Sequence, residues 1–165
     1  MVDGGALAVC LIVPIVGGML LGFLSSKDIK TWYASLTKPS WNPPNWLFGP
    51  VWTVLYAMMG YASYAVYEKG GFSRQAVPLG IYIAQLVLNF LWTPLFFTAH
   101  RLDVAFVDIA LLWGMVIATI ATFYPVIGPG LSLGLLLPYL AWVSFASCLN
   151  FWLWRHNADK QSLLS

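Results

Sequence analysis

Apolar residues follow one another in five long runs along this chain, separated by short polar links. The runs cover residues 4–24, 46–67, 76–99, 104–127 and 131–154. An α-helix needs about 20 mostly apolar residues to cross a bilayer, so each run is long enough for one crossing. A transmembrane β-barrel would instead show segments of about ten residues with alternating polarity. The pattern therefore predicts an all-α membrane protein, a single domain over residues 1–165 built as a five transmembrane helix bundle.

The composition supports a lipid environment. Hydrophobic residues make up 60% of the chain and charged residues only 8%, where soluble domains carry about 25% charged residues. The net charge of +2 is too small for a nucleic-acid footprint, so no nucleic-acid partner is expected. Cys10 and Cys148 lie in apolar runs without a neighbouring histidine cluster, and no metal site or obligatory cofactor is predicted.

The cationic residues predict an orientation. Cytoplasmic loops of membrane proteins carry an excess of Lys and Arg. With five crossings, six cations fall on one side of the membrane: Lys27, Lys30, Lys38, Arg101, Arg155 and Lys160. Only Lys69 and Arg74 fall on the other side. We therefore expect the first link, the third link and the C-terminus to lie in the cytosol.

The first link, residues 25–45, is unlike an ordinary connection. Its second half is rich in tryptophan and proline, through Trp32, Trp41, Pro39, Pro43 and Pro44. A stiff, apolar loop of this kind is expected to fold back onto the bundle. Two interpretations stay open: a lid over a cavity, or an anchor in the membrane interface.

Interior prolines and tryptophans indicate where a cavity forms. Proline kinks helices and opens space within a bundle, and four of the five runs contain one: Pro14, Pro50, Pro94 and Pro138. Several tryptophans lie too deep to belong to an interfacial belt: Trp52, Trp92, Trp113 and Trp142. A buried indole needs an acceptor for its N–H. These rings therefore either line a flat apolar pocket or only pack between helices.

Polar residues inside the runs are functional candidates, because they are costly in a membrane. Asp108 is the only acid within a run, and whether it is buried is left open. Asp103 is predicted to be the N-cap of that helix. Gln85 and Asn89 are four residues apart and share one helix face, which suits hydrogen bonds between helices, a ligand, or both. No hydrolase, metalloprotease or nucleotide-binding motif is present.

The chain closely resembles the translocator protein family, also called the tryptophan-rich sensory protein or peripheral-type benzodiazepine receptor family, and looks like an animal member. The resemblance is carried by residues 32–56 around Lys38-Pro39-Ser40-Trp41-Asn42-Pro43-Pro44-Asn45-Trp46, by residues 85–97 and by residues 138–150. It implies a five-helix fold with a cavity beneath the first loop.

The resemblance also implies ligands and a location. The ligands are porphyrins (protoporphyrin IX, haem), cholesterol or another lipid, and synthetic isoquinoline or benzodiazepine compounds. The implied location is the mitochondrial outer membrane, or for a paralogue the endoplasmic reticulum or plasma membrane, with the protein as a homodimer. Positions that match the family's ligand pocket are Trp32, Phe48, Trp52, Tyr56, Asn89, Asp108, Trp142, Ala146 and Leu149.

The resemblance favours a receptor-like or transporter-like binding protein. The alternative is an enzyme that degrades porphyrin with light and oxygen, in which Trp52 and Trp142 would be the catalytic residues. The family's sterol-contact stretch reads Leu149, Phe151 and Arg155 here, with phenylalanine in place of tyrosine. Phenylalanine lacks the hydroxyl that would hydrogen-bond a sterol.

Overall fold

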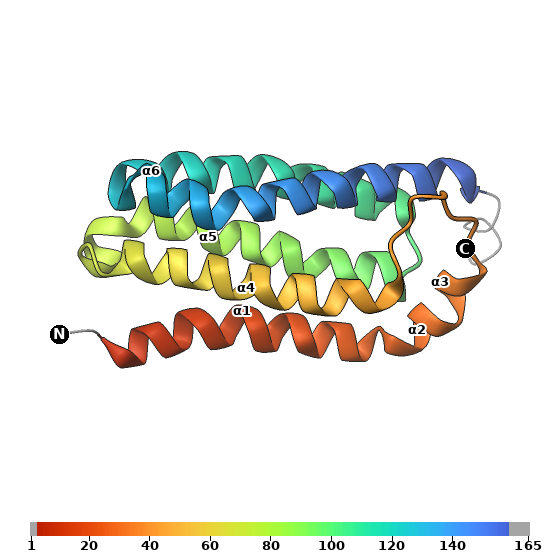
Figure 1. Cartoon of the computed structure of the whole chain (residues 1–165), viewed down its shortest axis with the longest axis horizontal. Helices are drawn as coiled ribbons and strands as arrows, with labels where there is room; N and C mark the ends of the chain where they lie inside the picture. Colours follow the sequence, from red (N-terminus) through yellow and green to blue (C-terminus); the bar gives the residue numbers. More distant parts are fainter. Residues whose placement is uncertain (1–2, 159–165) are drawn as a thin grey trace.

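The computed structural model describes residues 3–158. Every regular element in this part of the chain is a helix, as predicted (Figure 1). The long helices are α1 (Gly4–Leu24), α4 (Asn45–Tyr67), α5 (Gly71–Thr93) and α6 (Leu102–His156), and the short ones are α2 (Ser26–Lys30), α3 (Trp32–Ser35) and the π-helix η1 (Pro94–Thr98). The long helices lie side by side along one axis, with α2 and α3 at one end (Figure 1).

Helix α6 is a hairpin. It has 55 residues, which would extend about 80 Å as a straight helix, far more than the roughly 30 Å of bilayer hydrocarbon. At Gly128 the backbone leaves the helical region, with φ 79° and ψ 163°, a conformation that glycine adopts without a steric penalty. The chain reverses there, and the two legs of α6 return antiparallel to each other (Figure 1). The bundle therefore has five long helical segments, as expected.

Three helical stretches of the described chain are long and apolar enough to cross a membrane: Gly4–Leu24, Gly71–Thr98 and Leu102–His156. The last of these contributes both legs of the hairpin. Helix α4 has 23 residues and is long enough to cross. Its mean hydropathy is too low for it to be included, because hydropathy scales treat its tyrosines and tryptophans as weakly polar. The membrane class of the fold is thus supported, whereas the count of five crossings stays a prediction.

The first link contains structure that the sequence pattern did not predict. Residues 25–45 were expected to form one loop, but they include α2 and α3 before the chain becomes extended. The expected folding back onto the bundle is confirmed, because Tyr33 and Leu36 are buried. Thr37 is held by the side chain of Asn157, which accepts from the Thr37 N–H at 2.8 Å and donates to the Thr37 carbonyl at 3.0 Å.

Helix α5 differs from the predicted run at both ends. It begins at Gly71 rather than at residue 76, with an irregular residue at Gln75. It ends at Thr93, and the five residues from Pro94 continue as η1. Proline has no N–H to donate to the preceding turn, and single π-turns often mark functional sites inside helices.

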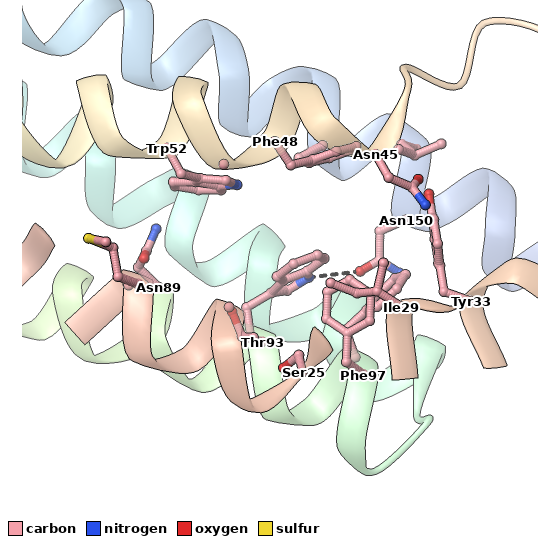
Figure 2. Close-up of a pocket in the computed structure, with 18 of the residues that line it drawn as sticks. Ser25, Ile29, Tyr33, Asn45, Phe48, Trp52, Asn89, Thr93, Phe97 and Asn150 are labelled. Carbon is pink, nitrogen blue, oxygen red and sulfur yellow. Dashed lines mark hydrogen bonds between the residues drawn. The ribbon is translucent and has the colours of Figure 1, made fainter. Parts of the chain in front are cut away.

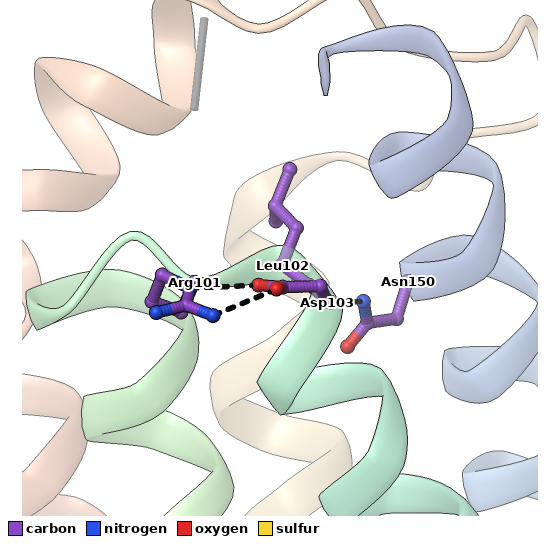
Figure 3. Close-up of polar contacts among 4 residues, drawn as sticks. All are labelled: Arg101, Leu102, Asp103 and Asn150. Carbon is purple, nitrogen blue, oxygen red and sulfur yellow. Dashed lines mark hydrogen bonds and ion pairs between the residues drawn. The ribbon is translucent and has the colours of Figure 1, made fainter. Parts of the chain in front are cut away.

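The predicted N-cap of α6 is wrong. Arg101 occupies the cap position, and Asp103 lies in the first turn. The Asp103 carboxylate accepts hydrogen bonds from Arg101 Nε at 2.9 Å and Nη2 at 2.8 Å (Figure 3). An acid in the first turn still interacts favourably with the helix dipole, which explains why the pattern resembled a cap.

The core is densest in the half of the bundle away from α2 and α3. Met59, Val66 and Phe123 have no exposed surface there. Helix α1 approaches α4 closely in this half, since a Cβ atom on Gly60 would lie 2.3 Å from the carbonyl oxygen of Cys10. Small residues allow such contacts between membrane helices.

The cations group as the predicted orientation requires. Lys27, Lys30 and Lys38 belong to the link at one end of the bundle, and Arg101 and Arg155 lie at the helix ends on that same side (Figure 1). Lys69 and Arg74 flank the α4–α5 turn at the opposite end. Lys160 lies outside the described residues. Which end faces the cytosol stays a prediction.

Candidate functional site: an uncharged aromatic cavity

A cavity of about 420 Å³ lies in the half of the bundle beneath α2 and α3 (Figure 2). Its walls come from α1, α4, α5, η1 and the second leg of α6, and Ile29 of α2 and Tyr33 of α3 contribute from the roof. This size lies within the range of small-molecule pockets, about 300–1,000 Å³. We call α2 and α3 together, residues 26–35, the roof.

Aromatic rings dominate the walls. Seven of the 21 lining residues are aromatic: Tyr33, Phe48, Trp52, Tyr56, Trp92, Phe96 and Phe97. On α4, the rings of Trp52 and Tyr56 stack with centroids 5.4 Å apart. On the facing elements, Trp92 of α5 and Phe96 of η1 lie 4.7 Å apart and nearly parallel, at 30°. The cavity is therefore bordered by two pairs of nearly parallel rings, an arrangement that suits a flat, apolar ligand.

Among residues 3–158, no charged side chain lines the cavity. Its polar lining side chains, apart from the tyrosine hydroxyls, are the hydroxyls and amides of Ser25, Asn45, Thr53, Asn89, Thr93 and Asn150. Burying an ionised carboxylate or amine without a partner is strongly unfavourable. The interior therefore favours the uncharged part of any ligand, and its amides and hydroxyls can hydrogen-bond carbonyl or hydroxyl groups.

A hydrogen-bond network across three helices forms the floor. Tyr56 of α4 donates to Asn89 Oδ1 at 2.7 Å, Asn89 Nδ2 donates to the Tyr139 hydroxyl at 2.9 Å, and Tyr139 donates to Gln85 Oε1 at 2.8 Å. The predicted interhelical role of Gln85 and Asn89 is thereby confirmed. The Asn89 amide retains one N–H and one lone pair beyond these bonds, and Asn89 lines the cavity.

A second polar link fixes one wall. Trp92 Nε1 donates to Asn150 Oδ1 at 3.0 Å, the bond drawn in Figure 2. Asn150 Nδ2 in turn donates to the carbonyl of Leu102 at 2.9 Å, and Asn150 lies beside Leu102 in Figure 3. The link joins α5 to both legs of α6 and orients the Trp92 indole within the wall.

The roof is held partly by Tyr33. Its hydroxyl donates to Asn42 Oδ1 at 2.9 Å, and Lys38 Nζ lies 4.6 Å from the centre of its ring. Burial raises the pKa of Tyr33 to about 12. In the first link, Tyr33 lines the cavity and Trp41 is exposed, so both predicted roles, a lid and an interfacial anchor, stay open.

The structure brings together six of the nine predicted pocket positions. Phe48, Trp52, Tyr56, Asn89, Ala146 and Leu149 line the cavity. Trp32 and Trp142 are not among the lining residues. They pack behind lining rings, Trp32 against Phe96 at 5.8 Å and Trp142 against Phe48 at 5.7 Å. That any of these residues binds a ligand stays a prediction.

Asp108 is placed differently from the expected pocket position. It is buried in the first leg of α6 but is not among the residues that line the cavity. Within the described chain, its Oδ2 atom has no hydrogen-bond partner. The open question of its burial is therefore answered, and its predicted role in ligand binding loses direct geometric support.

The sterol-contact residues do not form one site. Leu149 is buried and lines the cavity, whereas Phe151 and Arg155 are exposed on the outside of the bundle. Phe151 packs against Phe106, with ring centres 5.2 Å apart. A ligand within the cavity would therefore contact only Leu149 of the three.

Sequence reasoning missed part of the lining. Gly18, Met19 and Gly22 come from α1, whose uniform apolar run shows no inward face. Phe96 and Phe97 are turned toward the cavity by η1. Pro94 was the available signal for these two rings, because a proline at that position disturbs the helix that carries them.

An all-helical bundle with membrane-length helices and a roofed aromatic cavity indicates a polytopic membrane protein with a candidate small-molecule site. Residues 10–155 match the TspO/MBR family, and the chain belongs to it, which confirms the resemblance found in the sequence. The chain is 47% identical to "Translocator protein" of Ovis aries, over 91% of this chain and 94% of that protein.

Two other relatives are similar over most of the chain. "Translocator protein" of Homo sapiens is 51% identical over 76% of this chain and 75% of its own length. "Tryptophan-rich protein TspO" of Archaeoglobus fulgidus is 41% identical over 90% of this chain and 97% of its own length.

Proposed function

We propose that this protein is a receptor-like or transporter-like membrane protein that binds porphyrins, such as protoporphyrin IX or haem, and sterol in the roofed cavity. The observation that carries the proposal is the combination of about 420 Å³ of space, seven lining aromatic residues and no charged lining residue. Flat or rigid ring systems bury apolar area against such walls at a low entropic cost.

The cavity chemistry also predicts how a porphyrin is oriented. Its two carboxylates would be unpaired inside an uncharged cavity. They should therefore point out of the cavity, toward the end of the bundle that carries Lys27, Lys30 and Lys38. A synthetic isoquinoline or benzodiazepine compound has no carboxylates that must reach the outside, so it would fit the interior as a neutral ligand.

The decisive experiment fills the cavity from α1. Gly22 lines the cavity, and a Cβ atom on it would meet nothing within 4 Å. Gly22→Phe should occupy the ligand's space and weaken protoporphyrin IX binding more than tenfold, about 1.4 kcal/mol. Quenching of tryptophan fluorescence in detergent measures the affinity.

The matched control is Gly80→Phe. Gly80 is also an exposed helical glycine with open space around it, but it does not line the cavity. The Gly80→Phe variant should bind protoporphyrin IX with the same affinity as the unmodified protein. Equal affinity of the two variants would refute this placement of the site.

Degradation of porphyrin by light stays an untested prediction. The mechanism needs a redox-active indole beside the porphyrin ring, and of the two predicted catalytic residues only Trp52 lines the cavity. Binding needs no such chemistry and is the function that we propose.

The membrane setting completes the proposal. We infer five crossings, with the roof and C-terminus in the cytosol because the cations gather at that end. The mitochondrial outer membrane and a homodimer are proposed from the family. A membrane-impermeant thiol reagent in intact mitochondria should label Thr37→Cys beside the roof but not Ser73→Cys at the opposite end. The reverse labelling would overturn the orientation.

A further inference from the structure

His100 has an unusual backbone at the junction between η1 and α6. Its φ is +54°, and it is the only residue other than glycine with a positive φ in the described chain. Ala99 N–H donates to the Pro94 carbonyl at 2.8 Å, and Arg101 N–H donates to the Leu95 carbonyl at 3.1 Å. Glycine is the usual residue at such a helix end. A histidine retained there despite the steric penalty suggests that its side chain has a role.

The His100 imidazole contacts both helices of the roof. Its Nε2 atom lies 3.6 Å from Asp28 Oδ1 of α2, slightly too far for a hydrogen bond. Its ring stacks on the Trp32 indole of α3, with centroids 4.2 Å apart and planes at 18°. The same indole packs edge-on against Phe96, which lines the cavity. One side chain thus joins the roof to the wall segment η1.

The roof segment has a second attachment of different chemistry. On the other side, the neutral amide of Asn157 holds the backbone of Thr37, just after α3. The Asn157 attachment does not change with pH near neutrality. The His100 attachment can change, because histidine alone among the side chains usually changes charge between pH 5 and 8.

Asp28 is the carboxylate that lies against His100. Within the described chain, the contacts of the imidazole are Asp28 from α2 and Trp32 from α3. The adjacent Arg101 pairs with Asp103. Lys27 and Lys30, the other charges of α2, are exposed. A protonated ring would gain attraction to the carboxylate and to the face of the indole.

We propose that His100 is a positioning residue that latches the roof over the cavity in its protonated state, so that a bound ligand leaves more slowly at acidic pH. The inference rests on the proposed function, since it assumes that the cavity holds a ligand. Raising the pH removes the charge of the imidazole and weakens the latch, while the Asn157 attachment persists. The change in charge therefore alters how often the roof opens.

The test compares His100→Asn with the unmodified protein at pH 6.0 and pH 8.0. Asparagine tolerates a positive φ and does not titrate, so the variant keeps the helix end but loses the charge and the stacking on Trp32. The pH dependence, rather than the absolute protection, is therefore compared. The first readout is hydrogen exchange of residues 26–36 without ligand, corrected for the intrinsic pH dependence of exchange. The second is the dissociation rate of protoporphyrin IX dimethyl ester, a probe without titrating carboxylates.

In the unmodified protein, the roof should be about two- to fivefold better protected at pH 6.0, and the ester should leave more slowly by a similar factor, as expected for a partly exposed ion pair. His100→Asn should abolish both differences. The matched control is His156→Asn, because His156 also stacks on a tryptophan, Trp152, at 3.8 Å, but does not contact the roof. This control should keep both differences.

The outcomes separate the two proposals. The latch is overturned if His100→Asn keeps the pH dependence of roof protection, or if His156→Asn removes it equally. If the ester does not bind at all, the proposed function and ligand retention both fail, while hydrogen exchange still decides whether the latch exists.

Discussion

The two halves of the bundle are built from the same long helices but are packed differently. Toward the α4–α5 turn, Met59, Val66 and Phe123 have no exposed surface, and the hollow at that end lies between α4 and the turn of the α6 hairpin rather than among these side chains. Beneath the roof, the same helices enclose about 420 Å³ of space. The contrast teaches that hydrophobicity places helices in a membrane, whereas the size and stiffness of individual side chains decide whether the interior is filled.

Two local features produce the contrast. Helix α1 meets α4 at the Gly60–Cys10 contact in the filled half, but a Cβ on Gly22 would meet nothing within 4 Å in the hollow half. Beyond Pro94, η1 replaces the regular helix, and Phe96 and Phe97 lie in the cavity wall. The Tyr56–Asn89–Tyr139–Gln85 network separates the two halves.

The largest effect is expected from truncating a ring in the filled half. Phe123→Ala should lower the free energy of unfolding by about 3–5 kcal/mol, because it leaves a cavity in dense packing. Phe97→Ala, which enlarges an existing cavity, should lower it by less than half as much. Unfolding in mixed detergent micelles measures both. Equal losses would mean that the halves are packed alike.

A smaller effect is expected where α1 meets α4. Gly60→Ala places a methyl group against the Cys10 backbone and should destabilise the protein by about 1–3 kcal/mol, since backbone cannot move aside cheaply. Gly22→Ala should be neutral or slightly stabilising, because alanine is the better helix former. Thermal denaturation in detergent compares the pair. A destabilising Gly22→Ala would show that α1 is packed closely along its whole length.

The smallest of the three effects is expected in the hydrogen-bond network that separates the two halves. Tyr139→Phe removes the acceptor of Asn89 and the donor to Gln85, and should lower the free energy of unfolding by about 1–2 kcal/mol, as for interhelical hydrogen bonds in membranes. Ligand affinity should fall too, because Asn89 then keeps only its hydrogen bond from Tyr56 and is oriented less firmly. A variant with unchanged stability and affinity would show that the network does not organise the floor.

The sequence alone determined the class of fold. The five apolar runs predicted the helical bundle, because backbone groups in lipid must be satisfied within each segment. The 4–24 run coincides with α1, and the 46–67 run begins one residue after α4 does. The shared face of Gln85 and Asn89 followed from the helical repeat alone.

Only the tertiary structure decided how the interior is divided. Helical spacing says which residues share a face, but not which neighbour that face meets. Asp108, which the resemblance placed in the pocket, is buried outside the cavity lining, while Gly22, which was not predicted to line the pocket, forms part of the wall. His100 and Asp28 are far apart in the chain, and their approach depends on how the first link folds over η1. Packing between segments is a long-range property, which no local pattern of polar and apolar residues contains.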